Sequence, residues 1–287
     1  MATRACTLTA RVTDAAGHTA TATAVLSVRE PAPLGWSPPN STAGDLTAML
    51  SRFPSPPLVR LYSPAGAGLA SWSGSLLTCA PRSATLVYSF KDPPAGVDVA
   101  GWLSARPAAW TSPLYLCWAH EPEQGPSAGD PLPAEFREGW RVLVAQLAGH
   151  RRRREVRLLP VFTEYAARRS GTWWQDFGQV AALSGVDAVG FDIYDTGYSA
   201  YRSPVERNDF ALATARRAGK PLVIAEWGIA RKASDPDGAV CARAMRENVA
   251  YLRRQPDVDA VSWFYRGDCN LDGREPERKA FVDLMAG

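Results

Sequence analysis

The segment LYLCWAH, residues 114–120, is an almost unbroken apolar run. An amphipathic segment follows at residues 134–150, and a second apolar run, VRLLPVFTE, covers residues 156–164. In the middle segment the apolar residues that recur every three to four positions are Phe136, Trp140, Val144 and Leu147. Continuous apolar runs are typical of parallel strands buried on both faces, and the longer period is typical of a helix. This stretch therefore predicts a strand–helix–strand unit.

The same alternation continues through most of the chain. The expected strands are Leu34–Ser37, Leu58–Tyr62, Thr85–Phe90, Leu114–His120, Val156–Glu164, Val186–Asp195, Pro221–Gly228 and Val258–Gly267. Eight such units in about 250 residues predict an α/β protein of the (β/α)8 TIM-barrel type. The alternative is an open, doubly wound sheet, which needs a glycine-rich first turn; residues 35–39, GWSPP, do not form one.

The N-terminal residues have a different pattern. Residues 6–12 and 21–28 alternate as two strands, and residues 14–18 between them are a turn signal. This pattern resembles the last hairpin of an immunoglobulin-like or PKD-type β-sandwich. The resemblance implies that residues 1–29 are the end of a truncated domain, residues 30–33 a linker and residues 34–287 the barrel. A signal peptide is then expected upstream, with a secreted or cell-surface location.

Composition argues against several classes of protein. The formal net charge is only +3, and the basic run at residues 151–154 is expected at the solvated end of the predicted helix, so nucleic acid is not an expected partner. No run of about 18 apolar residues predicts a membrane span. Three His in the chain argue against a His-rich metal site, and no cofactor is expected.

The five cysteines are widely spaced. They are Cys6, Cys79, Cys117, Cys241 and Cys269, and no CxxC motif occurs. This favours a compartment that permits disulfides over a zinc site. Cys6 is expected to lack its partner, Cys269 is a candidate to bridge to Cys241, and the pairing is left open.

Two glutamates stand where strands end. Glu121 follows the fourth expected strand, and Glu226, in Ile224-Ala225-Glu226-Trp227-Gly228, ends the seventh. Barrel active sites form at the carboxyl ends of the strands. Two carboxyl groups about 5–5.5 Å apart suit glycoside hydrolysis with retention, in which one donates a proton and the other attacks. We therefore expect Glu121 to be the acid/base and Glu226 the nucleophile.

These motifs resemble the clan of (β/α)8 glycoside hydrolases with an acid/base after strand 4 and a nucleophile after strand 7. His120 before Glu121 resembles glycoside hydrolase family 26, which contains endo-β-mannanases and some β-1,3-xylanases and mixed-linkage glucanases. The spacing of the two glutamates (226 minus 121, or 105 residues) also fits. Pro122 and Glu123 depart from the mannanase pattern, which leaves the sugar open.

The resemblance implies further site residues. His120 contacts the sugar or orients a carboxyl group, Tyr194 donates a hydrogen bond to the nucleophile, and Arg60 lies near it. Trp263 is the implied sugar platform. Trp118 and Trp227 are additional candidates for stacking.

Other polar residues are given structural roles. Glu164 and Asp192 are assigned to polar contacts or structural pairing. Residues 268–273, DCNLDG, resemble the start of a calcium loop, but the twelfth position is Lys279, so a plain turn is preferred.

The sequence therefore predicts a monomeric retaining β-glycanase, mannanase-like, whose partner is a polysaccharide or oligosaccharide. The alternative is a non-catalytic carbohydrate-binding or cell-surface barrel. A metal-dependent hydrolase is disfavoured by the scarcity of histidine.

Overall fold

The computed structural model describes residues 3–29, 31–126 and 129–286, and it divides into the compact units Met1–Ala32 and Pro33–Gly287. The first unit is an antiparallel hairpin of β1 (Thr3–Thr13) and β2 (Thr19–Arg29). At its turn, one carboxylate oxygen of Asp14 accepts hydrogen bonds from the backbone N–H groups of Ala16 and His18, each at 2.9 Å. The expected turn chemistry thus closes the hairpin.

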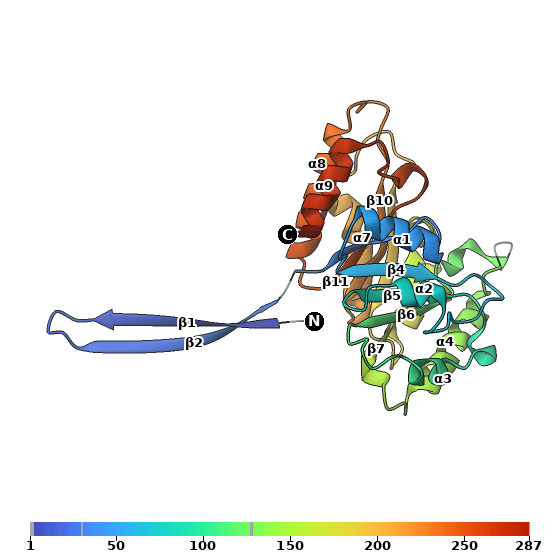
Figure 1. Ribbon diagram of the computed structural model, residues 1–287, viewed down its shortest axis with the longest axis horizontal. Coiled ribbons are helices and arrows are strands. Elements are labelled where there is room, and N and C mark those ends of the chain that lie inside the picture. Colours follow the sequence, from blue (N-terminus) through green and yellow to red (C-terminus); the bar gives the residue numbers. More distant parts are fainter. Residues whose placement is uncertain (1–2, 30, 127–128, 287) are drawn as a thin grey trace. The chain divides into compact units, whose positions relative to one another are not determined.

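The second unit contains the parallel sheet. Its strands are β3 (Leu34–Ser37), β4 (Leu58–Tyr62), β5 (Thr85–Phe90), β6 (Leu114–Trp118), β7 (Val156–Leu158), β8 (Val161–Thr163), β9 (Val189–Asp195), β10 (Leu222–Ile229) and β11 (Val258–Phe264). Their order across the sheet is β7-β6-β5-β4-β3-β11-β10-β9-β8, and the neighbours β4, β5 and β6 can be followed in Figure 1. All the pairings are parallel, as the continuous apolar runs predict.

The two edge segments of this sheet belong to one barrel strand. β7 pairs with β6, β8 pairs with β9, and only Leu159 and Pro160 separate β7 from β8. Backbone bonds continue on both sides of this break, from Leu159 to Leu116 at 3.0 Å and from Gly190 to Pro160 at 2.7 Å. The sheet therefore closes on itself, and the predicted TIM-type barrel is confirmed.

Helices follow the strands in the expected alternation. They are α1 (Ala43–Arg52), α2 (Ser75–Cys79), α3 (Val99–Ser104), α4 (Pro133–Leu147), α5 (Glu164–Arg169), α6 (Trp173–Asp176), α7 (Pro204–Ala218), α8 (Ala239–Arg254) and α9 (Glu275–Ala286). Short 3-10 helices are η1 (Pro94–Gly96), η2 (Pro122–Gln124), η4 (Arg153–Glu155), η5 (Gly178–Ala182) and η6 (Gly267–Cys269). The helices α8 and α9 lie side by side (Figure 1).

Alternate residues of the strands fill the barrel. The buried cluster contains Leu58, Val87, Tyr115, Cys117, Leu159, Val161, Ala188, Val223, Ala225 and Ala260. On β4, Leu58, Arg60 and Tyr62 are successive residues of one face, since strand side chains alternate. The interior therefore changes from apolar to polar toward the carboxyl ends of the strands.

Some predicted boundaries were wrong. The strand β6 ends at Trp118 rather than His120, because Ala119 and Glu121 have positive φ angles of 46° and 55°. The helix α4 ends at Leu147, before the basic run at residues 151–154. Part of that run forms η4, in which Arg153 binds Asp187 at 2.7 Å, so the run is not a helix end.

The outer face of β6 packs tightly on α4. Trp118 stacks on Phe136 of α4, with ring centroids 5.7 Å apart. Gly139 allows this approach, because a β carbon at position 139 would lie 2.2 Å from the Trp118 ring. Along the described ranges, no helix has the length and apolarity needed to cross a membrane.

Candidate active site

A cavity of about 1090 Å³ opens at the carboxyl ends of the barrel strands. It is lined by residues from the loops after most of the strands, which include Ser41, Tyr62, Ser63, Lys91, His120, Glu121, Gln124, Thr163, Tyr194, Thr196, Glu226, Phe264, Arg266 and Asp268. Both predicted glutamates are among them. The two carboxyl groups therefore share one pocket at the end of the barrel where such sites form.

Glu121 is held in an unusual backbone conformation. Its φ and ψ of 55° and 50° are left-handed, and Pro122 begins η2 directly after it. Its N–H donates to the Val161 carbonyl at 2.9 Å, and the Gln124 amide donates to its carboxylate. Burial, followed by the charge of Glu226, raises the pKa of Glu121 to about 7. A carboxyl group with such a pKa can keep a proton near neutral pH.

Glu226 faces the cavity because β10 is irregular. The pairing of β10 with β9 shifts between Ile224 and Glu226, so Ala225 is an extra residue opposite β9. Ala225 belongs to the buried cluster, Glu226 lines the cavity, and Trp227 is fully buried. A regular strand would place Ala225 and Glu226 on opposite faces.

Three polar groups surround the Glu226 carboxylate. The phenol of Tyr62 donates to Oε1 and the phenol of Tyr194 donates to Oε2. Arg60 Nε lies 3.8 Å from Oε1. Burial, followed by the charge of Glu226, raises the pKa of both phenols, so each keeps the proton that it donates. These groups stabilise negative charge on Glu226.

Arg60 is itself completely buried. Its Nη1 donates to Ser89 Oγ at 2.6 Å, and its guanidinium carbon lies 4.6 Å from the Tyr62 ring centroid. Burial opposes the charge of this side chain, but nearby Tyr62, Asp192 and Glu226 raise its pKa overall. The structure therefore places Arg60 beside the nucleophile candidate, as the resemblance implied.

Tyr62 is the residue that the sequence analysis missed. It lies two positions after Arg60 on β4, so the alternation of side chains places both on one face. Its hydroxyl also contacts Ser37 Oγ at 3.1 Å, and its ring lies 5.2 Å from the His120 ring. The two-residue period from Arg60 is the signal that could have identified it.

If Glu226 is the nucleophile, as we expect, replacing Tyr62 by Phe should lower kcat by about a hundredfold, since it removes one of the two phenols that donate to this carboxylate. The matched control is Tyr88→Phe on the neighbouring strand β5. The Tyr88 hydroxyl contacts Ser63 and accepts a hydrogen bond from Ala70 N–H, so its contacts differ from those of the Tyr62 hydroxyl, which donates to Glu226. Equal steady-state kinetics for the two variants would exclude a role for Tyr62 in holding Glu226.

His120 lines the cavity next to Glu121. Burial, followed by the charges of Arg60 and Lys91, lowers the pKa of its imidazole, so the ring is neutral. Its Nδ1 has no hydrogen-bond partner in the described part of the chain. Lys91 Nζ donates to the His120 carbonyl at 3.0 Å and pairs with Asp130. A neutral imidazole can donate or accept one hydrogen bond with a sugar hydroxyl.

The three tryptophans expected to stack on sugar do not line the cavity. Trp227 and Trp263 are fully buried and pack edge to face, with ring centroids 4.8 Å apart. Trp263 Nε1 donates to the Cys269 carbonyl at 3.0 Å, and Trp118 packs on α4. These assignments were wrong, because the three indoles pack behind the strands and offer no free face to a sugar.

Phe264 takes the position expected for Trp263. It is the next residue of β11, lines the cavity and is partly exposed. Its ring packs edge to face on Tyr194, with centroids 5.4 Å apart. An aromatic ring therefore does stand at the mouth on strand β11, one residue later than expected.

Asp192 is a buried carboxyl group near the site, and Glu123 is a half-buried one. Neither oxygen of Asp192 has a hydrogen-bond partner among the residues that the structure describes. Burial, followed by the charges of Glu226 and Glu121, raises its pKa well above the ordinary value. Glu123 accepts hydrogen bonds from Trp173 Nε1 at 2.7 Å and Thr163 N–H at 3.3 Å, and burial raises its pKa to about 8. The hydrogen bonds of Glu123 thus connect η2 to α6 and β8.

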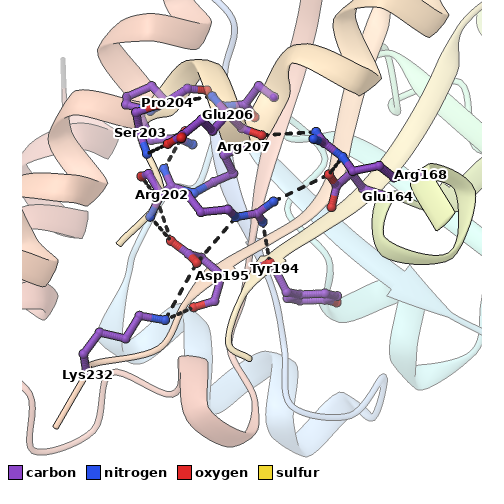
Figure 2. A network of polar contacts seen from close by, with 12 residues as sticks. Glu164, Arg168, Tyr194, Asp195, Arg202, Ser203, Pro204, Glu206, Arg207 and Lys232 are labelled. Atoms are coloured by element: carbon purple, nitrogen blue, oxygen red, sulfur yellow. Dashed lines mark hydrogen bonds and ion pairs between the residues drawn. The ribbon is translucent and has the colours of Figure 1, made fainter. Parts of the chain in front are cut away.

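Glu164 has the structural role assigned to it. It is buried and pairs with Arg168 at 2.6 Å and with Arg202 at 3.6 Å (Figure 2). It is not among the residues that line the cavity. Arg202 also donates to the Tyr194 carbonyl at 2.8 Å. The network therefore anchors the backbone of Tyr194 from behind.

The loop that resembles a calcium site is a turn. Asp272 is bound by Arg52 at 2.7 Å and by the Tyr265 hydroxyl at 2.8 Å. In residues 3–29, 31–126 and 129–286, no group of three or more His, Cys, Asp or Glu could hold a metal ion. Cys241 and Cys269 are free thiols, so the bridge considered between them is not formed. The Cys6 side chain lies outside what the structure describes.

In this barrel, Glu121 after β6 and Glu226 within β10 line one cavity at the carboxyl ends of the strands, where barrel enzymes have their active sites. The chain belongs to the glycosyl hydrolase catalytic core family, whose model matches residues 100–281. It is accordingly a glycoside hydrolase by family, with carbohydrate as the implied substrate. No curated protein matches the sequence significantly.

Solved structures with the same fold are glycosidases of low identity. An endo-β-1,3-glucanase of glycoside hydrolase family 128 from Amycolatopsis mediterranei is 18% identical, with a TM-score of 0.58 over 88% of this chain and 99% of that one. A glucosidase from Croceicoccus marinus is 15% identical, with a TM-score of 0.58 over 90% and 69%. An endo-β-1,4-mannanase from Thermotoga petrophila is 12% identical, with a TM-score of 0.54 over 90% and 77%. At these identities the likeness establishes the fold.

Proposed function

We propose that this protein is a retaining glycoside hydrolase that cleaves a β-linked polysaccharide, with Glu226 as nucleophile and Glu121 as acid/base. The observation that carries the proposal is that the two carboxyl groups share one cavity in different environments. Glu226 accepts two phenolic hydrogen bonds beside Arg60, and Glu121 has a pKa near 7. Such a difference is what acid and nucleophile roles require.

In the first step, a Glu226 oxygen forms a bond to the anomeric carbon while the bond from that carbon to the leaving oxygen breaks. Glu121 transfers its proton to the leaving oxygen, so the departing sugar is neutral. In the second step, water attacks the anomeric carbon and gives a proton to Glu121, and the bond to Glu226 breaks. Both carboxyl groups return to their starting states.

We further propose an endo-acting, mannanase-like specificity. It is supported by the His120–Glu121 pair and by the fold shared with an endo-β-1,4-mannanase. Phe264 offers a partly exposed ring at the cavity, and its apolar face suits a pyranose in place of the Trp263 platform. The fold shared with an endo-β-1,3-glucanase makes β-glucan the competing substrate.

The test is release of reducing sugar from mannan, glucomannan, mixed-linkage glucan and xylans, compared with Glu226→Gln. We expect release by the wild type from at least one of these, with β-mannan preferred, and none by the variant. Label from a 2-fluoro-glycoside should appear on Glu226. No release and no label with any of these sugars would favour a non-catalytic carbohydrate-binding barrel.

Secretion and domain context are also proposed. We propose that the hairpin of β1 and β2 is the end of an immunoglobulin-like or PKD-type domain and that the protein acts as a monomer outside the cell, where polysaccharide is accessible. The support is the alternating pattern of residues 6–12 and 21–28 with its closed turn.

A further inference from the structure

Tyr198 is an exposed aromatic residue next to the cavity. It lies on the loop between β9 and α7, and its exposed fraction is 40%. Thr196, two residues earlier on the same loop, lines the cavity, whereas Tyr198 does not. The loop therefore leads directly from the cavity wall to this ring. Most other aromatic side chains around the barrel are buried and unable to meet a ligand.

The Tyr198 ring rests on a fixed base. The guanidinium carbon of Arg202 lies 4.3 Å from the ring centroid, which is a cation–π contact. Only 11% of the Arg202 side chain is exposed, because it pairs with Glu164 and donates to the Tyr194 carbonyl (Figure 2). One ring face is thus covered by an anchored side chain, which leaves the other face for a ligand.

The loop is anchored at both of its ends as well, at Asp195 and at Arg202. Arg202 N–H donates to Asp195 at 3.1 Å, and Asp195 pairs with Arg207 at 2.9 Å (Figure 2). Lys232 donates to the Asp195 carbonyl at 2.7 Å. Because these contacts fix both ends of the loop, a ligand on Tyr198 has to supply less ordering free energy than it would on a loop with free ends.

We propose that Tyr198 is a stacking platform for a sugar residue of the polysaccharide chain where the chain leaves the cavity. The flat ring suits the apolar face of a neutral pyranose. Arg202 lies against one ring face, is already paired with Glu164 and Asp195 and is 11% exposed, so the ring and not the guanidinium is the group that meets the ligand. Thr196 lines the cavity and lies two residues before Tyr198, so the ligand on Tyr198 is the same polysaccharide chain that enters the cavity. This subsite therefore rests on the proposed glycosidase function.

The test compares Tyr198→Ala with the wild type on a polymer and on the shortest oligosaccharide that is cleaved. On the polymer, loss of one stacking contact is expected to raise KM roughly three- to tenfold with kcat unchanged, since the contact is the same in ground and transition states. On the short substrate, both constants should be unchanged. Tyr198→Phe should retain the wild-type KM because it keeps the ring.

The matched control is Tyr251→Ala, on the last turns of α8, a helix whose end leads into β11 at the opposite end of the barrel. It should leave KM on the polymer unchanged. An equal KM for Tyr198→Ala and the wild type on the polymer overturns the platform. So does an equal rise on both substrates, which would indicate a disturbed cavity.

Binding of the uncleaved polymer separates this proposal from the catalytic one. Affinity gel electrophoresis with glucomannan, mixed-linkage glucan and xylan would be run on Glu226→Gln with and without Tyr198→Ala. Weaker retention of the double variant supports the platform even where no cleavage is found. If the wild type cleaves polymer and retention of both variants is equal, the platform alone is wrong. If the wild type neither binds nor cleaves any of these polymers, both proposals fail.

Discussion

Replacing Glu226 by Gln is expected to lower kcat by at least about a thousandfold, because an amide cannot form the covalent bond to the anomeric carbon. The fold should persist, since Gln has nearly the same volume: its carbonyl oxygen can accept the hydrogen bond of one of the two phenols, and its amide NH2 can donate to the oxygen of the other. The measurement is steady-state kinetics on the preferred polysaccharide, with circular dichroism as the check on folding.

Azide supplies the control that assigns the roles. With Glu226→Ala, azide can occupy the vacated space and attack from the same face, which gives a product of inverted configuration. With Glu121→Ala, azide instead intercepts the glycosyl-enzyme and gives a product of retained configuration. The opposite pairing of variant and product would exchange the roles of the two glutamates. Full activity in Glu226→Gln would remove Glu226 from the mechanism.

Replacing Glu121 by Gln is expected to lower kcat/KM on polysaccharide about 10²- to 10⁴-fold, the range for loss of a general acid. The pH profile should change as well. In the proposed mechanism the protonated form of Glu121 is the active one, and its pKa is about 7, so kcat/KM of the wild type should fall as the pH rises through about 7. The fall in kcat/KM above pH 7 should be absent from the pH profile of Glu121→Gln. This profile is measured on an aryl glycoside whose leaving group departs without protonation.

Glu123→Gln is the matched control for that profile. Glu123 lies two residues further on and has a pKa of about 8, so it titrates in a neighbouring range. Replacing Glu123 should leave the fall in kcat/KM near pH 7 unchanged, because Glu121 is still present. If this fall disappears in Glu123→Gln and persists in Glu121→Gln, the titrating acid has been misidentified.

The strands were predictable because a buried parallel strand is apolar on both faces and therefore stands out as a run. The eight expected strands all occur, with β7 and β8 as two parts of the fifth. The errors in the predicted strands lie at their ends, because local backbone geometry determines the residue at which a strand stops. The left-handed residues Ala119 and Glu121 that end β6 have no sequence signature, since neither is Gly or Asn.

Because the strands are apolar on both faces, the site was only partly predictable from the sequence. Polar residues within apolar runs or directly after them, such as Glu121, Glu226, Arg60 and Tyr194, stand out in the sequence. The structure brings them around one cavity or its floor. Trp263 and Phe264 do not stand out, because a strand with two apolar faces gives no indication of which face is inside. The extra residue Ala225 in β10 also breaks the alternation of side chains between the two faces of the strand, so the alternation rule could not predict which way Glu226 points.

The contact between Gly139 and Trp118 limits how this protein can be stabilised. Glycine inside a helix is less favourable than alanine by about 1 kcal/mol, so Gly→Ala is a standard choice for a more heat-resistant variant. Here the added methyl group would meet the indole at 2.2 Å and push α4 away from the strand that leads to Glu121. Engineering for thermal tolerance must therefore use the solvent-facing positions of α4 and leave this glycine in place.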